Sequence, residues 1–152
     1  MMTKLLFLCG VQGSGKSTFA RTQKVMMDAE VVATDVIRKK YKDIKEEDVF
    51  PTAYKLAADF LNNGKNVIFD ATNITKDVRK RNLDAILSLL NCKVETSIVV
   101  FRIDPDECKR RVEIRNSLPG EFFIPLEVID SYYEKFELIS DDEGFDNIYY
   151  ID

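Results

Sequence analysis

The sequence of 152 residues contains no histidine. Without histidine, the chain cannot form a Ser-His-Asp or Cys-His catalytic arrangement, and it cannot hold a metal ion through imidazole ligands. Any general base must therefore be a carboxylate, with lysine and tyrosine as weaker alternatives. This absence narrows the catalytic chemistry before any motif is considered.

Cysteines are few, and long apolar runs are missing. The cysteines are odd in number and widely spaced, which predicts neither a disulfide framework nor a metal-ligand motif. We expect buried structural thiols in a reducing, cytoplasmic protein. No apolar run approaches the ~18 residues of a membrane helix, and the run at 5–9 is too short for a signal peptide, so no membrane partner is expected. The cysteines are Cys9, Cys92 and Cys108.

Size and charge indicate a single globular domain spanning residues 1–152. A chain of this length can bury one sizeable core. The net charge of −4 is unevenly distributed: residues 1–115 hold 21 basic and 16 acidic side chains, whereas residues 116–152 hold one basic and ten acidic side chains. The acidic C-terminal part disfavours nucleic-acid binding over the whole surface, although it leaves room for a local basic groove.

A glycine-rich motif follows the apolar run at 5–9. Residues 10–17 read Gly-Val-Gln-Gly-Ser-Gly-Lys-Ser, which matches the phosphate-binding loop pattern GxxxxGK[ST] between a strand and a helix. In such a loop, backbone N–H groups bind phosphate oxygens, Lys16 contacts the β- and γ-phosphates, and the Ser17 hydroxyl binds Mg²⁺. A glycine-rich turn without a ligand is the weaker alternative. The expected triphosphate-binding residues are Gly10, Gln12, Gly13, Ser14, Gly15, Lys16, Ser17 and Thr18.

Alternating strand and helix patterns predict an α/β fold, with a parallel sheet covered by helices on both faces. The functional site of such a fold lies at the carboxyl ends of its strands, and three of these ends carry candidate residues: Gly10, Asp35 and Asp70. Strands are expected at 4–9, 31–33, 66–70, 94–103 and 148–151, and helices at 16–27, 36–42, 46–63, 76–90, 105–115 and 125–136.

The third expected strand, residues 66–70, ends in an acid. An apolar strand that closes on Asp70 is the Walker-B pattern, in which the carboxylate holds Mg²⁺ directly or through water. The alternative is an aspartate that caps the next turn. Thr72 and Asn73 follow; both are candidate substrate contacts, and Asn73 fits a turn residue equally well.

Two further pairs of residues lie at helical spacing. Asp35 and Arg38 are three residues apart and share one helix face, which would suit a general base and a cation beside the acceptor. A helix-capping Thr34-Asp35 with a surface arginine is the alternative. Arg111 and Arg115 lie four residues apart next to a Pro-Gly loop, where they could contact ATP; on spacing alone, ion pairing within the helix is favoured.

Taken together, these motifs resemble the P-loop kinases of the polynucleotide 5′-hydroxyl kinase type. The resemblance implies the strand order 2-3-1-4-5, a helical lid at about 105–124, ATP and Mg²⁺. It implies that Asp35 is the general base, that Arg38 grips an acceptor phosphate and that Arg115 is the lid arginine. With Lys16, these are the expected catalytic residues. The matching segments are Gly10–Thr18, Thr34-Asp35-x-x-Arg38, residues 69–73, and Arg111-x-x-x-Arg115-Asn116 followed by Ile124-Pro125-x-x-Val128.

The acceptor is the open part of this resemblance. A polynucleotide 5′-hydroxyl is the first expectation; a kinase for sugars, nucleotides or antibiotics and a non-catalytic ATP-binding regulatory module are the alternatives. A GTPase is disfavoured because the chain has no NKxD motif. From the length we expect no phosphatase or ligase domain of the kind that many polynucleotide kinases carry. Basic residues near the acceptor side form either a nucleic-acid groove or, as we favour slightly, solvated helix faces: Lys39, Lys40, Lys42, Lys76, Arg79, Lys80 and Arg81.

Overall fold

A five-stranded parallel sheet forms the centre of the computed structural model, which describes residues 2–152. The strands lie in the order β2-β3-β1-β4-β5, and all four neighbouring pairs run parallel, as the resemblance implied. The parallel pairing follows from the helical connection between successive strands. The strands are β1 (Thr3–Cys9), β2 (Ala29–Ala33), β3 (Asn66–Asp70), β4 (Val94–Phe101) and β5 (Asn147–Ile151).

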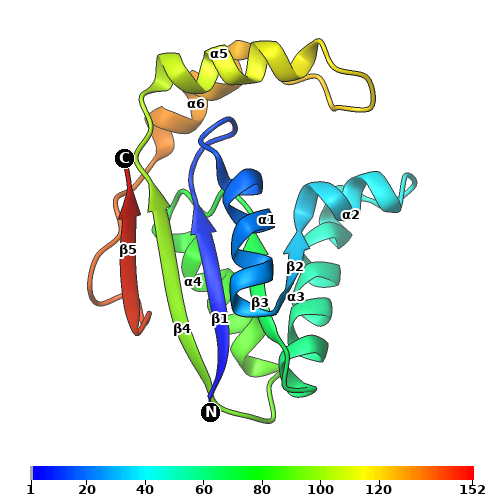
Figure 1. Cartoon of the computed structure of the whole chain (residues 1–152), viewed down its shortest axis with the longest axis vertical. Helices are drawn as coiled ribbons and strands as arrows, with labels where there is room; N and C mark the ends of the chain where they lie inside the picture. Colours follow the sequence, from blue (N-terminus) through cyan, green and yellow to red (C-terminus); the bar gives the residue numbers. More distant parts are fainter. Residues whose placement is uncertain (1) are drawn as a thin grey trace.

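Within the described residues, six helices connect and cover the sheet. Figure 1 shows α1 in front of one face, α3 and α4 behind the other, and α5 and α6 beyond the carboxyl ends of the strands. No helix in residues 2–152 combines the length and apolar character required to cross a membrane. The helices are α1 (Lys16–Met27), α2 (Thr34–Lys40), α3 (Glu46–Asn62), α4 (Lys76–Ser88), α5 (Pro105–Asn116) and α6 (Leu126–Lys135).

The two faces of the sheet have separate cores, because alternate side chains of each strand point to opposite sides. Leu5 and Phe7 of β1 pack with residues of α3 and α4. Leu6 and Leu8 of the same strand pack with Ala20 of α1. β1 is buried on both faces, and this explains its nearly continuous apolar sequence.

Strand register brings the three predicted strand ends together. Asp70, the last residue of β3, pairs with Leu8 of β1 on one side and with Ala33 of β2 on the other. The glycine-rich loop therefore begins two residues beyond one neighbour of Asp70, and Asp35 lies two residues beyond the other. The predicted cap at Thr34-Asp35 is wrong: Ala33 is the N-cap of α2, and no side chain caps the helix.

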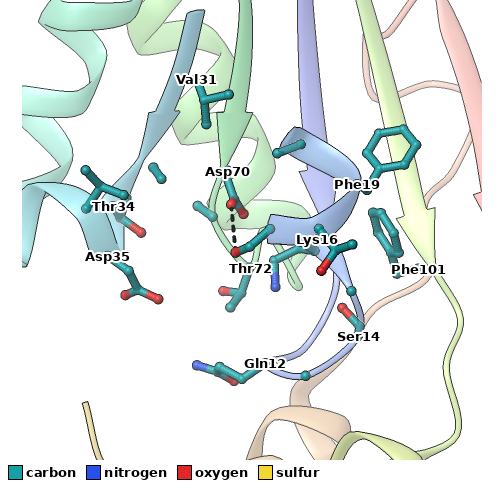
Figure 2. Close-up of a pocket in the computed structure, with 18 of the residues that line it drawn as sticks. Gln12, Ser14, Lys16, Phe19, Val31, Thr34, Asp35, Asp70, Thr72 and Phe101 are labelled. Carbon is teal, nitrogen blue, oxygen red and sulfur yellow. Dashed lines mark hydrogen bonds between the residues drawn. The ribbon is translucent and has the colours of Figure 1, made fainter. Parts of the chain in front are cut away.

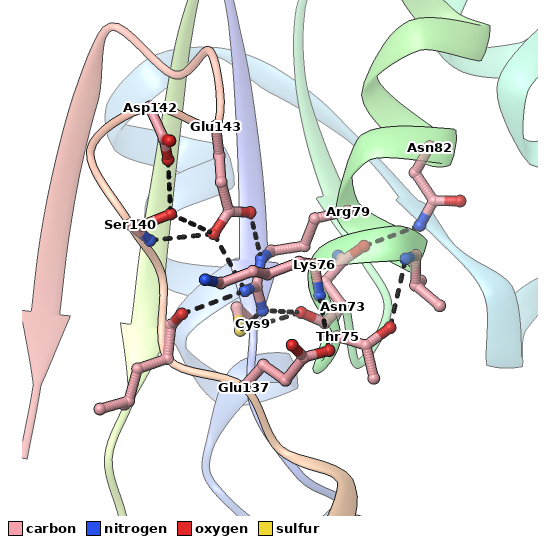
Figure 3. Close-up of polar contacts among 12 residues, drawn as sticks. Cys9, Asn73, Thr75, Lys76, Arg79, Asn82, Glu137, Ser140, Asp142 and Glu143 are labelled. Carbon is pink, nitrogen blue, oxygen red and sulfur yellow. Dashed lines mark hydrogen bonds and ion pairs between the residues drawn. The ribbon is translucent and has the colours of Figure 1, made fainter.

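A buried ion pair between Arg79 and Glu143 holds the turn that follows β3. The guanidinium of Arg79, on α4, is fully buried and donates from Nε and Nη2 to the two carboxylate oxygens of Glu143, at 2.7 and 3.1 Å. Its Nη1 donates to the backbone oxygen of Asn73 at 2.9 Å (Figure 3). Arg79 is thus neither part of a basic groove nor a solvated helix residue, and both alternatives from the sequence are wrong for this position.

Asn73 is the second part of this buried network. It has a left-handed backbone with φ 50°, is 0% exposed, and donates from Nδ2 to the backbone oxygen of Leu8 at 2.7 Å. Its Oδ1 accepts from Asn82 at 2.7 Å. Asn73 is therefore a turn residue that joins the ends of β1 and β3. The predicted substrate contact is wrong because the side chain is enclosed and its polar atoms are already used.

Glu143→Gln tests the stabilising role of the ion pair. The variant leaves the Arg79 charge buried without a carboxylate, which typically destabilises a fold by about 3–5 kcal/mol. We expect a loss in the free energy of unfolding of about 3 kcal/mol, at the lower end because the amide oxygen still accepts a hydrogen bond. Urea unfolding measures it, with Lys80→Gln, which removes an exposed pair with Asp84, as the control. Equal stability of the two variants would contradict this role.

Candidate active site

The glycine-rich loop, Gly10–Ser17, joins β1 to α1 in a conformation that requires its glycines. A Cβ on Gly10 would lie 2.6 Å from the Ser14 hydroxyl oxygen, and one on Gly13, which has φ +82°, would lie 2.6 Å from the backbone oxygen of Cys108. Within residues 2–152, no backbone carbonyl accepts a hydrogen bond from the N–H groups of Gly13, Gly15, Lys16 or Ser17. The loop thus leaves several donors available at the start of a helix, where anions bind.

Two unpaired polar atoms lie in the same loop. Among the buried side-chain nitrogen and oxygen atoms of residues 2–152, only Gln12 Oε1 and Ser14 Oγ have no hydrogen-bond partner. Buried polar groups are normally paired, so a concentration of unpaired groups in one loop is typical of a ligand site. The loop is therefore suited to a polar ligand such as a phosphate chain.

Lys16 and Asp70 carry opposite charges in the wall of the cleft (Figure 2). The side chain of Lys16 is buried, and Nζ donates to the backbone oxygen of Val11 at 3.3 Å. Burial lowers the pKa of Lys16, although the charges of Asp70 and Asp35 act against this shift. Burial also raises the pKa of Asp70, against the effect of Lys16. Each group would be favoured in its charged form by an added opposite charge, an anion for Lys16 and a cation for Asp70.

Ser17 and Asp70 form the predicted metal pair. The Ser17 hydroxyl donates to Asp70 Oδ2 at 3.4 Å. No group of three or more Cys, Asp or Glu side chains that could hold a metal by itself exists in the part of the chain that the structure describes. This donor set fits Mg²⁺, which takes few protein ligands and completes its coordination with waters and substrate phosphates.

A row of charged side chains on α2 lies opposite the glycine-rich loop. Arg38 Nη1 donates to Asp35 Oδ1 at 2.8 Å, and Nε and Nη2 donate to the carboxylate of Glu46 at 3.1 and 2.5 Å. Asp35 is half exposed and points into the space between α2 and the loop (Figure 2). Its Oδ2 accepts no hydrogen bond from any group in residues 2–152, so one carboxylate oxygen is available to an acceptor.

Arg38 keeps donors of its own. A guanidinium has five N–H groups, and these three bonds use three of them, so two remain for an anion in the cleft. Hydrogen bonds to Glu46 are the main cause that raises the pKa of Arg38, so the group stays charged. Glu46 was not expected from the sequence, because it begins a separate helix, eight residues away, and no periodic pattern links the two positions.

The two arginines of α5 have different positions. Arg111 donates from Nε to Glu107 Oε1 at 2.9 Å and from Nη1 to the backbone oxygen of Gly13 at 3.2 Å. Ion pairing within the helix, which the spacing favoured, is confirmed for Arg111 with Glu107, yet Arg111 also reaches the glycine-rich loop. Arg115 instead donates from Nε to Glu121 at 2.9 Å. Both arginines line the same cleft as Lys16 and Asp35.

Glu121, like Glu46, is a charged cleft residue that the sequence did not indicate. Glu121, in the loop between α5 and α6, accepts from Lys39 Nζ at 3.1 Å through the oxygen that also accepts from Arg115. It therefore links α2 to α5 across the cleft. Nothing in the sequence marks this pair, which is 82 residues apart.

The remaining predicted residues also lie at the cleft. Thr72 and Thr18 line it, and the backbone oxygen of Thr72 accepts from the Gly10 N–H at 2.9 Å. Gly10 is buried beneath the loop and shapes the cleft without lining it. One continuous cleft thus holds every predicted site residue except Gly10 and Asn73.

The three cysteines should differ in reactivity. Burial raises the pKa of Cys9 to about 11, against the effect of the Arg79 charge, so roughly one molecule in a thousand carries the thiolate at pH 8. Cys9 and Cys108 are buried, and Cys92 is exposed. We expect rapid alkylation of one thiol per native chain at pH 8, measured by mass spectrometry. Cys92→Ser should remove the fast reaction; fast labelling of Cys9 would contradict the packing around the loop.

Comparison with known proteins places this geometry in a family. Residues 5–139 match a family described as an AAA domain. The chain belongs to this family. This AAA domain is 25% identical over 145 residues to the bifunctional polynucleotide phosphatase/kinase of Schizosaccharomyces pombe, covering 95% of this chain and 32% of the relative. It thus spans about a third of that relative's length.

Solved structures agree with this assignment. A chain of the Pnkp1/Rnl/Hen1 RNA repair complex is 30% identical and superposes with a TM-score of 0.71, covering 88% of this AAA domain and 44% of that chain. A sugar kinase from Janibacter sp. HTCC2649 shares the fold, with a TM-score of 0.71 at 17% identity over 99% of this domain and 85% of that chain. The resemblance to P-loop kinases of the polynucleotide kinase type is confirmed: this domain has the P-loop kinase fold and is similar in sequence to polynucleotide kinase.

Proposed function

We propose that this domain transfers the γ-phosphate of ATP to a 5′-hydroxyl of a polynucleotide. The observation that carries the proposal is the placement of Asp35 across one cleft from Lys16, Ser17 and Asp70. A phosphate-binding loop alone supports nucleotide binding; a carboxylate with one unpaired oxygen facing that loop supports transfer to a hydroxyl.

The proposed donor site uses the glycine-rich loop and two side chains of the cleft wall. The free N–H groups of the loop and the Lys16 ammonium would bind the β- and γ-phosphates of ATP. Ser17 and Asp70 would hold Mg²⁺, which when bound neutralises the phosphate oxygens. Gln12, Ser14 and Thr18 line the same part of the cleft and complete the donor site.

The proposed transfer step takes place between Asp35 and Lys16. The Asp35 carboxylate would accept the proton of the acceptor hydroxyl while the hydroxyl oxygen bonds to the γ-phosphorus and the bond from that phosphorus to the β–γ bridging oxygen breaks. ADP leaves with the bridging oxygen. Arg38 would hold an acceptor phosphate with its two remaining donors, and Thr72 lies where it could contact the acceptor.

Residues 105–124 serve as a lid in this proposal. α5 begins at a cap in which the Asp104 side chain accepts from the Asp106 N–H at 2.8 Å, and it packs over the glycine-rich loop where Val112 meets Gly13. Arg111 already contacts the loop, and Arg115 would turn from Glu121 to the ATP phosphates.

Residues 1–152 form one kinase domain in this proposal. The absence of disulfides among three free thiols suits a reducing, cytoplasmic setting.

A labelled-acceptor assay tests the proposed activity. We expect label from γ-labelled ATP on 5′-hydroxyl oligonucleotides with Mg²⁺ present, and none with Lys16→Ala, because that variant removes the buried cation beside the phosphates. A panel of sugars, nucleosides and aminoglycosides is tested alongside. Label on small molecules alone would replace the polynucleotide with a metabolite acceptor, and equal activity of Lys16→Ala would exclude the kinase.

Asp35→Asn separates transfer from nucleotide binding. Loss of the general base should lower kcat by roughly 10²–10⁴, while the affinity for ATP, measured by calorimetry, stays near the wild-type value because Asp35 contacts no part of the loop. The control is Asp43→Asn, an exposed aspartate near the end of α2 without an ion pair in the described chain. A collapse of ATP affinity in Asp35→Asn would instead make Asp35 a metal or nucleotide ligand.

A further inference from the structure

The Glu121 carboxylate connects α5, in the proposed lid, with α2, which carries the proposed acceptor residues Asp35 and Arg38. Glu121 Oε2 accepts from both Lys39 and Arg115, and the three side chains are only 28–37% exposed. Arg115 and Lys39 are the main causes that lower the pKa of Glu121, so the carboxylate stays ionised. An anion position therefore exists between α2 and α5, with two cations directed at it.

Lys39 is aligned with the proposed transfer residues. It lies four residues, about 6 Å of helix rise, beyond Asp35 on the same face of α2. Arg38 bends back to Asp35, whereas Lys39 reaches the loop between α5 and α6. Lys40, the next residue, lies over the ring of Tyr41 and lines a different hollow. Lys39 is thus directed into the cleft, and its neighbour is directed away from it.

An aromatic side chain adjoins this anion position, and a second follows it in the sequence. Lys39 Nζ lies 5.6 Å from the centre of the Phe122 ring. Phe122 and Phe123 are 46% and 74% exposed, which is unusual for rings of this size. Cations interleaved with exposed rings are the features with which proteins bind single-stranded nucleic acid, the phosphates on the cations and the bases on the rings.

We propose that Lys39 binds the second phosphate of a single-stranded polynucleotide acceptor, and that the Glu121 carboxylate occupies this phosphate position until the strand displaces it. This inference rests on the proposed function. Arg38, next to Asp35, takes the first phosphate after the 5′-nucleoside; Lys39 takes the following one, beside Phe122. Displacement of Glu121 also releases Arg115 toward ATP, so binding of a strand assists the donor site.

Acceptors of two lengths test the subsite. Thymidine 3′-monophosphate has one phosphate and should not reach Lys39, whereas 5′-hydroxyl pentathymidylate should. We expect Lys39→Gln to raise KM for the pentanucleotide about fivefold and to leave KM for the monophosphate unchanged. Binding of labelled pentathymidylate, followed by fluorescence anisotropy between 50 and 200 mM salt, should lose about 0.7 in the slope of log K against log salt. Lys40→Gln is the matched control for charge alone.

Glu121→Gln tests the competing carboxylate. Removal of its charge should lower KM for the pentanucleotide about two- to fivefold, and this gain should vanish when Lys39→Gln is also present, because the two residues share one interaction. If Glu121→Gln acts by releasing Arg115, the variant would change KM for ATP, and that change would persist when Lys39→Gln is also present.

The outcomes separate the two proposals. An equal effect of Lys39→Gln on both acceptors, an equal effect of Lys40→Gln, or an additive double variant would overturn the subsite. Absence of transfer by the wild-type protein to either acceptor would overturn the proposed function. The anisotropy titration needs no turnover, and an unchanged salt slope in Lys39→Gln would exclude the subsite in that case as well.

Discussion

The buried ion pair between Arg79 and Glu143 holds together the parts of the chain that shape the cleft. A charge enclosed in protein is tolerated only with close partners. Arg79 comes from α4, and its partners come from the turn after β3 and from the segment before β5. The same turn is fastened to β1 by Asn73. The ends of β1 and β3, which carry the glycine-rich loop and Asp70, are therefore fixed by groups that do not line the cleft (Figure 3).

The cleft contains a cationic side chain and two carboxylates that do not form ion pairs with one another. Among the contacts of residues 2–152, Lys16 is buried without an ion pair, Asp70 is largely enclosed with only the Ser17 hydroxyl as a side-chain partner, and Asp35 has an unpaired oxygen. These groups stay separate because they lie on different strand ends of a rigid sheet. A triphosphate with a divalent cation supplies the missing opposite charge to Lys16 and Asp70 together, and this complementarity supports the proposed donor site more strongly than the loop motif does alone.

Sequence patterns predicted the elements well because each leaves a local signal. Strand β3 and helix α1 have the bounds that the apolar run and the glycine motif predicted. Strand order came from family resemblance and is confirmed. The burial of individual polar residues could not be predicted from local patterns. Arg79 and Asn73 are residue types usually found at the surface, and they are buried here because partners distant in sequence, such as Glu143, satisfy their polar groups. Glu46 and Glu121 were not predicted because each pairs with a residue of a different structural element, Arg38 and Lys39 of α2, and no local pattern links such positions.

The uneven charge of the sequence has a structural meaning that composition alone did not show. The acidic residues after 116 do more than keep the surface hydrated, because several of them form ion pairs with basic side chains of residues 1–115. Glu143 pairs with Arg79 inside the fold, Asp130 pairs with Lys109 between α5 and α6, and Glu121 pairs with Lys39 across the cleft. Such pairs differ in permanence: a buried carboxylate cannot leave its guanidinium without a large desolvation cost, whereas a partly exposed one exchanges readily for another anion. Burial therefore separates Glu143, a carboxylate that holds the fold, from Glu121, a carboxylate that a phosphate can replace.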